Sequence, residues 1–160
     1  MAISDEYLAG IFDGEGAVTM TLHKRGYMSL SVIVCMCSPA PILALYERFG
    51  GKVRNNQKTK EGSTVYRWEV NGANCVAALE IFSGLCLVKG KAAQIALPIA
   101  ISMMENSSRQ PLSREEKMSR ISAAEQLASV NKKMPLRNVF KKEYIDNYLS
   151  RSRVNQEVLS

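Results

Sequence analysis

The segment Leu8–Gly16, which reads L-A-G-I-F-D-G-E-G, narrows the possible folds of this chain more than any other part of it. Ser4 is suited to cap a helix, and Asp5 and Glu6 would occupy its first turn, where negative charge complements the helix dipole. Glycine inside a helix costs about 0.5–1 kcal/mol relative to alanine, so glycines there need a reason. We therefore predict a helix that begins near Asp5 and meets a close neighbour.

The predicted helix carries two apolar stripes, which implies two buried faces. One stripe comprises Leu8, Ile11 and Phe12, and the other comprises Ile3, Tyr7, Gly10 and Gly14. Gly10 and Gly14 lie four residues apart, which indicates that another backbone approaches this second stripe. The alternative is that Gly14 and Gly16 only end the helix as C-terminal caps.

Glu15 falls at the C-terminal end of this helix, where free carbonyl groups already make the field negative. A carboxylate there is unfavourable unless a cation joins it. Mg²⁺ takes one or two carboxylates together with carbonyl, water and phosphate oxygens, and the carbonyl of Gly14 is a natural neighbour. The alternative is an ordinary solvated glutamate.

Length and composition predict one compact domain, since 160 residues with 46% hydrophobic content can bury a sizeable core. The net charge of +6 and the pI near 9.2 favour a polyanionic partner. Residues 1–50 hold three Lys or Arg against five Asp or Glu, so the excess of basic charge follows the motif.

Cys35, Cys37, Cys75 and Cys86 lack the paired spacing of a zinc site, and His23 is the single histidine. We expect core thiols and no structural zinc. The sequence has no signal-peptide pattern, and its longest apolar run is too short to cross a bilayer. We expect an intracellular soluble protein with no membrane partner.

Alternating apolar residues predict a first β-hairpin, with strands over 17–25 and 28–36 joined at Gly26. A helix is predicted over 42–49, after Pro39 and Pro41 break the chain. A second hairpin is predicted from strands over 52–60 and 64–71. The outward side chains of the two hairpins would be Thr19, Thr21, His23, Arg25, Ser29, Ser31, Ile33, Arg54, Asn56, Lys58, Arg67 and Glu69.

Such an outward face suits DNA, because an antiparallel ribbon with Arg, Asn, Lys, Thr and Ser can enter the major groove and read base edges. The alternative is an ordinary solvated sheet face. Further helices are predicted over 75–82, 91–105, 139–149 and, beginning at a capping box of Ser113 and Glu116, up to Val130. Basic side chains in the last third are assigned either to the DNA backbone or to solvent: Lys141, Lys142, Arg151 and Arg153.

The segment Leu8–Gly16 resembles the motif that names the LAGLIDADG homing endonucleases. It matches at Leu8, Ala9, Gly10, Asp13 and Gly16, with Ile11, Phe12, Gly14 and Glu15 as usual variants. The helix, hairpin, helix, hairpin, helix order from about Ala2 to Met104 is similar to the single-motif branch. The resemblance implies an α+β fold: an αββαββα core over 1–105 with a curved four-stranded antiparallel DNA-binding sheet, and C-terminal helices over 106–160 packed on the same domain.

The resemblance also implies a function, a site-specific homing endonuclease that cuts both strands of a long pseudo-palindromic double-stranded DNA target. Because the chain has one motif, it would act as a homodimer whose motif helices pack along Tyr7, Gly10 and Gly14. Glu15 and the Gly14 carbonyl would bind Mg²⁺, for which Ca²⁺ or Mn²⁺ could substitute. Hydrolysis would leave 3′ overhangs and promote mobility of an intron or other element that encodes the protein.

Two lysines around Gly90 form a K-x-K-x-A pattern, in which the resemblance assigns Lys89 as the cation at the scissile phosphate and Lys91 as a phosphate contact. As a bare pattern, both would face solvent. Met36 and Ala40 depart from the family, which often has a polar residue and a basic residue there. Two alternatives therefore stay open: a DNA-binding regulator that does not cleave, and an RNA maturase that helps an intron fold.

Overall fold

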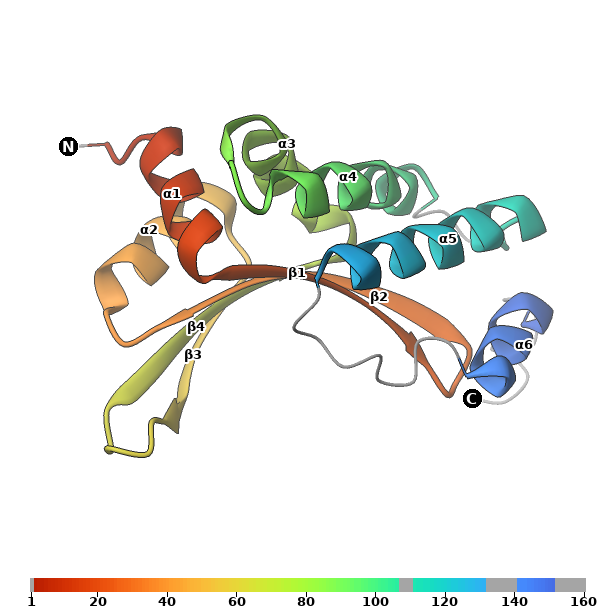
Figure 1. Ribbon diagram of the computed structural model, residues 1–160, viewed down its shortest axis with the longest axis horizontal. Helices are drawn as coiled ribbons and strands as arrows, with labels where there is room; N and C mark the ends of the chain where they lie inside the picture. The colour runs from red at the N-terminus through yellow and green to blue at the C-terminus, as the bar shows by residue number, and fades with distance from the viewer. Residues whose placement is uncertain (1, 107–110, 132–140, 152–160) are drawn as a thin grey trace.

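A computed structural model describes residues 2–106, 111–131 and 141–151, which form an open antiparallel sheet covered on one side by helices (Figure 1). In sheet order the strands are β1 (Gly16–His23), β2 (Tyr27–Met36), β4 (Thr64–Asn71) and β3 (Lys52–Lys58). The helices are α1 (Asp5–Glu15), α2 (Pro39–Phe49), α3 (Val76–Leu85) after the short 3-10 helix η1 (Gly72–Cys75), α4 (Gly90–Glu105), α5 (Arg114–Val130) and α6 (Lys142–Ser150). The predicted α+β class and order of elements are confirmed.

Helix α1 begins and ends as its sequence predicts. The Ser4 hydroxyl accepts a hydrogen bond from the Tyr7 N–H at 3.2 Å, and Leu8 and Phe12 are fully buried. Gly16 follows the helix with a φ of −84°, so a left-handed conformation does not explain the glycine. A Cβ at Gly16 would lie 2.1 Å from the Phe12 ring. This position therefore needs glycine for space.

The first hairpin has the predicted alternation. Val18, Met20 and Leu22 of β1 are buried, and each lies between half-buried neighbours on the opposite face. The strands turn at Gly26, whose φ of +79° lies in the left-handed region that glycine adopts at little cost. The sheet arches, so that the ends of both hairpins curve away from α3 and α4 (Figure 1).

The second hairpin corrects one prediction. Arg54 pairs with Arg67, but after a register shift Gln57 pairs with Val65 and Lys58 pairs with Thr64. A β-bulge adds one residue to β3 between Arg54 and Gln57, and this reverses the faces of the residues that follow. The prediction that Arg54, Asn56 and Lys58 share one face is therefore wrong. Lys58 lies on the opposite face from Arg54, and Asn56 lies within the bulge.

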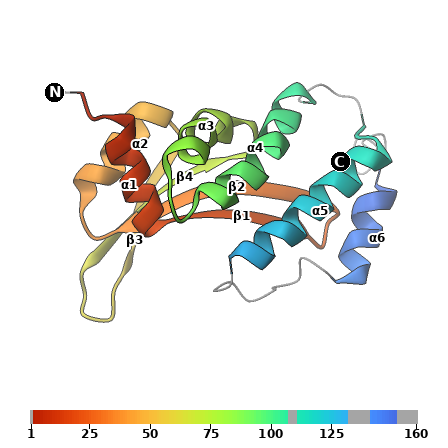
Figure 2. The ribbon, with the colours of Figure 1, turned by 45° about the horizontal axis from the view of Figure 1, so that its top comes forward.

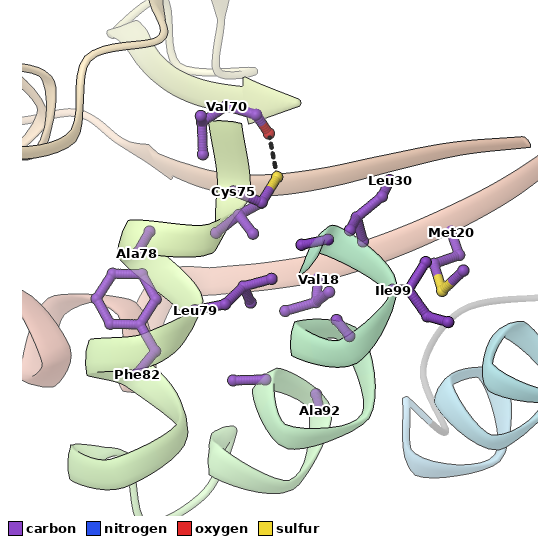
Figure 3. Close-up of a cluster of buried hydrophobic side chains, with 14 of the residues drawn as sticks. Val18, Met20, Leu30, Val70, Cys75, Ala78, Leu79, Phe82, Ala92 and Ile99 are labelled. Carbon is purple, nitrogen blue, oxygen red and sulfur yellow. Dashed lines mark hydrogen bonds between the residues drawn. The ribbon is translucent and has the colours of Figure 1, made fainter. Parts of the chain in front are cut away.

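The core lies between the sheet and the helices. Figure 3 shows Ile99 of α4 beside Met20 of β1, and the Cys75 thiol donating a hydrogen bond to the Val70 carbonyl oxygen, with 3.2 Å between sulfur and oxygen. Trp68 is fully buried, and its ring N–H donates to the Gly50 carbonyl oxygen at 2.7 Å. These contacts join strands of the sheet to the segments packed on it.

Two further expectations are corrected. Helix α2 begins at Pro39 and not at residue 42, because proline is tolerated in the first turn, where its missing N–H has no helical partner. Cys37 is exposed at the end of β2, so it is not a core thiol. No cluster of three His, Cys, Asp or Glu residues suited to a metal occurs in the described part of the chain.

The C-terminal helices pack against the end of the sheet that holds the first hairpin (Figure 2). Ser113 caps α5 by accepting from the Glu116 N–H at 3.1 Å, as predicted. The Glu116 carboxylate does not return to the cap, because it pairs with buried Arg120 at 3.3 Å and accepts from Ser102. None of the described helices is long and apolar enough to cross a membrane. Residues 139 and 140 of the last predicted helix, and Arg153, lie outside the described residues.

Candidate nuclease site and DNA interface

The end of α1 is joined to the start of α4 through the Asp13 carboxylate. It accepts hydrogen bonds from the backbone N–H groups of Leu87 at 3.0 Å, Val88 at 2.9 Å and Lys89 at 2.7 Å. These N–H groups precede the first residue of α4, so Asp13 acts as a cap supplied by another helix. The contact fixes Lys89 relative to α1.

The pKa of Asp13 is lower than its ordinary value. Burial is the largest single influence and by itself would raise the pKa. The backbone N–H groups of Lys89, Leu87 and Val88, together with the Lys89 ammonium, outweigh burial and stabilise the charged form. Asp13 therefore remains a carboxylate. From the sequence, Asp13 had no predicted role beyond matching the motif.

Three of the residues proposed for chemistry meet at this junction. Lys89 Nζ donates to the Gly14 carbonyl oxygen at 3.0 Å, and Glu15 follows Gly14 on the exposed end of α1. The negative end of this helix thus receives a cation, as the sequence argument required. The Lys89 ammonium is thus held at the Gly14 carbonyl oxygen, next in the chain to the exposed Glu15.

The sheet face that points away from the helices carries most of the polar residues predicted to read DNA. Thr19 pairs with Ser31, and Thr21 pairs with Ser29, across β1 and β2. Glu69 pairs with Ile33. Register therefore places on this face Thr19, Thr21, His23, Ser29, Ser31, Ile33, Arg54, Arg67 and Glu69, while exposed Arg25 lies in the turn after β1.

Several of these polar side chains hold one another. His23 Nε2 and Ser29 Oγ share a hydrogen bond at 2.8 Å, and the His23 ring stacks on the Tyr27 ring with 4.2 Å between centroids. Arg67 forms an ion pair with Glu69 at 3.0 Å. Mutual contacts of this kind keep long side chains in one orientation before a ligand arrives.

Other polar residues of this face were not named from the sequence, among them Asn71 and Gln57. Asn71 accepts a hydrogen bond from the Ser31 hydroxyl at 2.5 Å, and Gln57 enters the face because of the bulge. Asn71 continues the alternation of Arg67 and Glu69, so the strand pattern could have identified it. Nothing in the sequence indicated the bulge.

The second stripe of α1 is exposed. Tyr7 is 49% exposed, and no described residue lies within 4 Å of a Cβ built at Gly10 or Gly14. Packing within the described chain therefore does not explain either glycine. Beyond the end of α1, Leu87 is 95% exposed and Val88 is 75% exposed. An apolar surface thus surrounds the end of the helix.

Comparison with solved structures identifies the architecture. The homing endonuclease I-CvuI, solved with a DNA target in the presence of Mg, has a TM-score of 0.70 at 18% identity, covering 91% of both chains. The archaeal intron-encoded homing endonuclease I-Vdi141I, complexed with DNA, has a TM-score of 0.67 at 15% identity, covering 98% of this chain and 97% of that one. The chain has the LAGLIDADG homing endonuclease fold.

The LAGLIDADG fold also occurs in longer chains. The LAGLIDADG homing endonuclease I-SmaMI, solved bound to cleaved DNA, has a TM-score of 0.59 at 12% identity, covering 92% of this chain and 56% of that one. No protein-family model and no curated protein matches the sequence.

The predicted phosphate contact Lys91 and the two departures from the family pattern have these positions in the LAGLIDADG fold. Lys91 is exposed in the first turn of α4, one residue beyond Gly90. Met36 is half-buried, packs against the core and pairs with Tyr66. Ala40 is exposed in the first turn of α2. Met36 therefore serves packing and offers no group that could order water.

A thiol lies behind the junction. Cys86 donates to the Ala9 carbonyl oxygen, with 3.3 Å between sulfur and oxygen. Burial, assisted by the charge of Asp13 and opposed by Lys89, raises the pKa of Cys86 to about 11. The thiol is therefore neutral at physiological pH and serves as a packing and hydrogen-bonding group.

Proposed function

We propose that this protein is a site-specific DNA endonuclease that cuts both strands of a long pseudo-palindromic target as a homodimer. One observation carries the proposal: Glu15, the Gly14 carbonyl and Lys89 meet at the end of α1, beside an arched sheet whose polar face points away from the helices. The protein would thus combine a site for phosphodiester chemistry with a surface for base reading. The DNA complexes of I-CvuI and I-Vdi141I, which share the fold, support this assignment.

A second copy of the chain is the proposed partner of the α1 stripe. Gly10 and Gly14 leave the helix backbone open to close approach, and Tyr7 supplies apolar area beside them. A symmetric dimer along this stripe would bring two copies of Glu15 together, one for each DNA strand. Exposed Leu87 and Val88 would be covered in the same interface.

The donors at the junction fit a divalent metal. Glu15 offers an exposed carboxylate and Gly14 a carbonyl oxygen, which are the hard oxygen ligands that Mg²⁺ prefers alongside water and substrate phosphate. Ca²⁺ or Mn²⁺ could occupy the same ligands. When bound, the metal would polarise the scissile phosphate and help to generate hydroxide.

The chain's own residues then have separate roles. Lys89 would offset negative charge that develops on the phosphate, Asp13 would hold Lys89 in place through the backbone, and Lys91 would contact an adjacent phosphate. Side chains on the open sheet face would read base edges in the major groove. The cleavage would leave 3′ overhangs and would promote mobility of the element that encodes the protein.

The decisive experiment incubates the purified protein with a library of randomised duplex DNA and Mg²⁺, and sequences the new ends. We expect ends at one pseudo-palindromic sequence, with a constant offset between the two strands. Cleavage without sequence preference, or no cleavage and no binding, would contradict the proposal.

A non-cleaving DNA-binding regulator is the second candidate, and Met36 favours it because its apolar side chain cannot order water. In that case the protein would select a sequence from the same library in a gel-shift assay but would leave both strands intact with Mg²⁺ or Mn²⁺. Cleavage at the selected sequence would exclude this candidate.

A further inference from the structure

The tips of the two hairpins are supported in different ways. Helix α6 lies alongside the turn between β1 and β2, whereas the turn between β3 and β4 projects away from the helices (Figure 2). The second turn is held by its own hydrogen bonds: the Thr59 N–H donates to the Ser63 carbonyl oxygen at 2.8 Å and the Gly62 N–H to that of Thr59 at 3.0 Å. The first turn has partners from outside the sheet.

Side chains of the C-terminal region bind backbone carbonyl groups of this first turn. The Asn147 side-chain amide donates to the Lys24 carbonyl oxygen at 3.2 Å. The Arg151 guanidinium donates to the Arg25 carbonyl oxygen. Gly26 is buried beneath them, and a Cβ there would lie 3.0 Å from the Asn147 carbonyl oxygen. The turn is thus bonded at consecutive carbonyl groups and closely covered.

Helix α6 is itself fixed to α5. The ammonium of Lys117 donates to the Arg151 carbonyl oxygen at 2.6 Å and lies 5.6 Å from the centre of the Tyr148 ring. Tyr148 is only 4% exposed, and burial lowers the pKa of Lys117. A buried ammonium with a hydrogen-bond partner holds its position, because leaving it unpaired would be costly.

Helix α5 is in turn joined to the base of the same hairpin. The Asn131 side-chain amide, at the end of α5, donates to the Val18 carbonyl oxygen of β1 at 2.9 Å. The hairpin is therefore held at its base by Asn131 and at its tip by Asn147 and Arg151. These two supports, one at the base and one at the tip, fix the direction in which the hairpin extends.

We propose that α6 is a positioning element for base recognition, which sets the tip of the β1–β2 hairpin through Asn147 and Arg151. This inference rests on the proposed DNA-binding function. His23 and Arg25 lie on the supported tip, and hydrogen bonds to base edges lose most of their energy when a donor is displaced or misaligned. The β1–β2 hairpin is accordingly the more selective of the two, and the β3–β4 hairpin the more adaptable.

The first test needs no DNA. Amide hydrogen exchange is followed in wild type, Asn147→Ala and Arg151→Met, with Asn74→Ala and Arg114→Met as matched substitutions at exposed sites away from the turn. We expect exchange at Gly26, whose N–H donates to His23, to rise by about tenfold in the first two variants only. Exchange in the turn at 59–63 should not change. Unchanged exchange at Gly26 in folded variants would overturn the proposal.

The second test measures base preference by selection from randomised duplexes. For Asn147→Ala, we expect discrimination to fall by about tenfold at base pairs read by the β1–β2 hairpin, with preferences at other positions retained. An equal loss at every position would overturn a role specific to this hairpin. A wild type that selects no sequence would instead refute the proposed function and the recognition role together, while the exchange result would still report on the support itself.

A third variant changes Gly26, which lies on the hairpin side of the same contact. It keeps the proposal testable if Asn147→Ala or Arg151→Met does not fold. Gly26→Asn keeps a residue that tolerates positive φ but adds a Cβ 3.0 Å from the Asn147 carbonyl oxygen, which forces a small displacement. Faster exchange at Lys24 and Arg25 is expected. Exchange equal to that of wild type would show that close contact with α6 does not set the tip.

Discussion

Lys89 Nζ lies 3.0 Å from the Gly14 carbonyl oxygen and donates a hydrogen bond to it, so an internal cation contacts the oxygen that we propose as a metal ligand. Two unit charges about 4 Å apart at an effective dielectric constant of 20 repel by about 4 kcal/mol, and a divalent ion doubles that repulsion. An ammonium group and a metal would therefore bind at this carbonyl together only when the negative charge of a DNA phosphate offsets their repulsion. This relationship predicts that metal binding depends on DNA.

Replacing Lys89 by Met should have opposite effects on metal binding and on cleavage. Without DNA, removal of the ammonium should strengthen Ca²⁺ binding by about tenfold, measured by isothermal titration calorimetry, because repulsion is relieved. With DNA and Mg²⁺, cleavage should fall by about 10²–10³-fold, as when a charge-stabilising donor is lost. Lys60→Met, in the β3–β4 turn, removes the same charge elsewhere. Weaker Ca²⁺ binding in Lys89→Met would refute the competition.

Glu15→Gln should separate binding from cutting. The substitution removes the exposed carboxylate but leaves the strands proposed to face DNA unchanged, so affinity for the selected sequence should stay within about twofold, whereas cleavage should fall by at least about 10²-fold. Gel-shift titration and end-labelled cleavage would measure the two effects. Glu6→Gln, in the first turn of the same helix, is the control. Undiminished cleavage by Glu15→Gln would exclude this residue as a metal ligand.

Asp13→Asn should destabilise the junction between α1 and α4, because an amide cannot replace a carboxylate that accepts from successive backbone N–H groups. We expect a loss of about 1–3 kcal/mol in the free energy of unfolding near neutral pH, from urea denaturation.

The pH dependence gives this prediction a second observable. Since the native pKa of Asp13 is lower than its ordinary value of 3.8, its contribution is fully present above that value and is lost as the pH falls through the native pKa. Asp13→Asn should therefore reduce the dependence of stability on pH below 3.8. If the free energy of unfolding had the same dependence on acid pH in wild type and variant, the assigned hydrogen bonds would be contradicted.

Gly10→Leu should dissociate the proposed dimer. No described residue contacts a Cβ at this position, so the chain can accommodate the side chain, but a second helix packed on the stripe could not. Sedimentation equilibrium should give the dimer mass for wild type and the monomer mass for the variant, with unchanged circular dichroism. Ser122→Leu, at an exposed site on α5, should remain dimeric. A monomeric wild type would argue against the interface.

The thiols should differ in reactivity. Cys37 is exposed, whereas burial raises the pKa of Cys75 to about 12 and, with the charge of Asp13, that of Cys86 to about 11. At pH 8, a thiol reagent should modify Cys37 in the native protein and should reach Cys75 and Cys86 only after denaturant is added. Peptide mass mapping would identify each product. Rapid native modification of Cys75 would contradict its place in the core.

Local patterns were sufficient to predict most helices and strands, whereas their arrangement in one sheet followed from the resemblance to the LAGLIDADG motif. The Ser4 cap and the apolar stripe define α1, and strict alternation from Val18 to Leu22 defines a strand with one buried face. The division of the chain after residue 105 stays a prediction. In contrast, the role of Asp13 could not be read from the sequence, because its partners lie more than seventy residues away.

In the C-terminal region too, contacts between residues far apart in the chain could not be read from the sequence. In α5, the apolar residues Ile121 and Leu127 are buried, but Met118 is 47% exposed, and Lys117 and Arg120 are buried. The burial of these two basic residues depends on contacts with Arg151 and Glu116, so hydrophobicity alone does not identify every buried residue of the helix. The DNA-facing assignments of the sheet followed alternation, and they failed only where alternation was interrupted.

The β-bulge in β3 has a practical consequence for the design of variants with altered base preference, if the proposed function holds in the selection experiment. A combinatorial library that randomises every second codon of β3 from Arg54 onward would diversify Asn56 and Lys58, and Lys58 belongs to the other face of the sheet. The choice of every second residue has to shift by one position at the bulge, so that Gln57 follows Arg54 in the randomised set. A library without this correction would vary Lys58, which lies on the face opposite the proposed DNA-reading face.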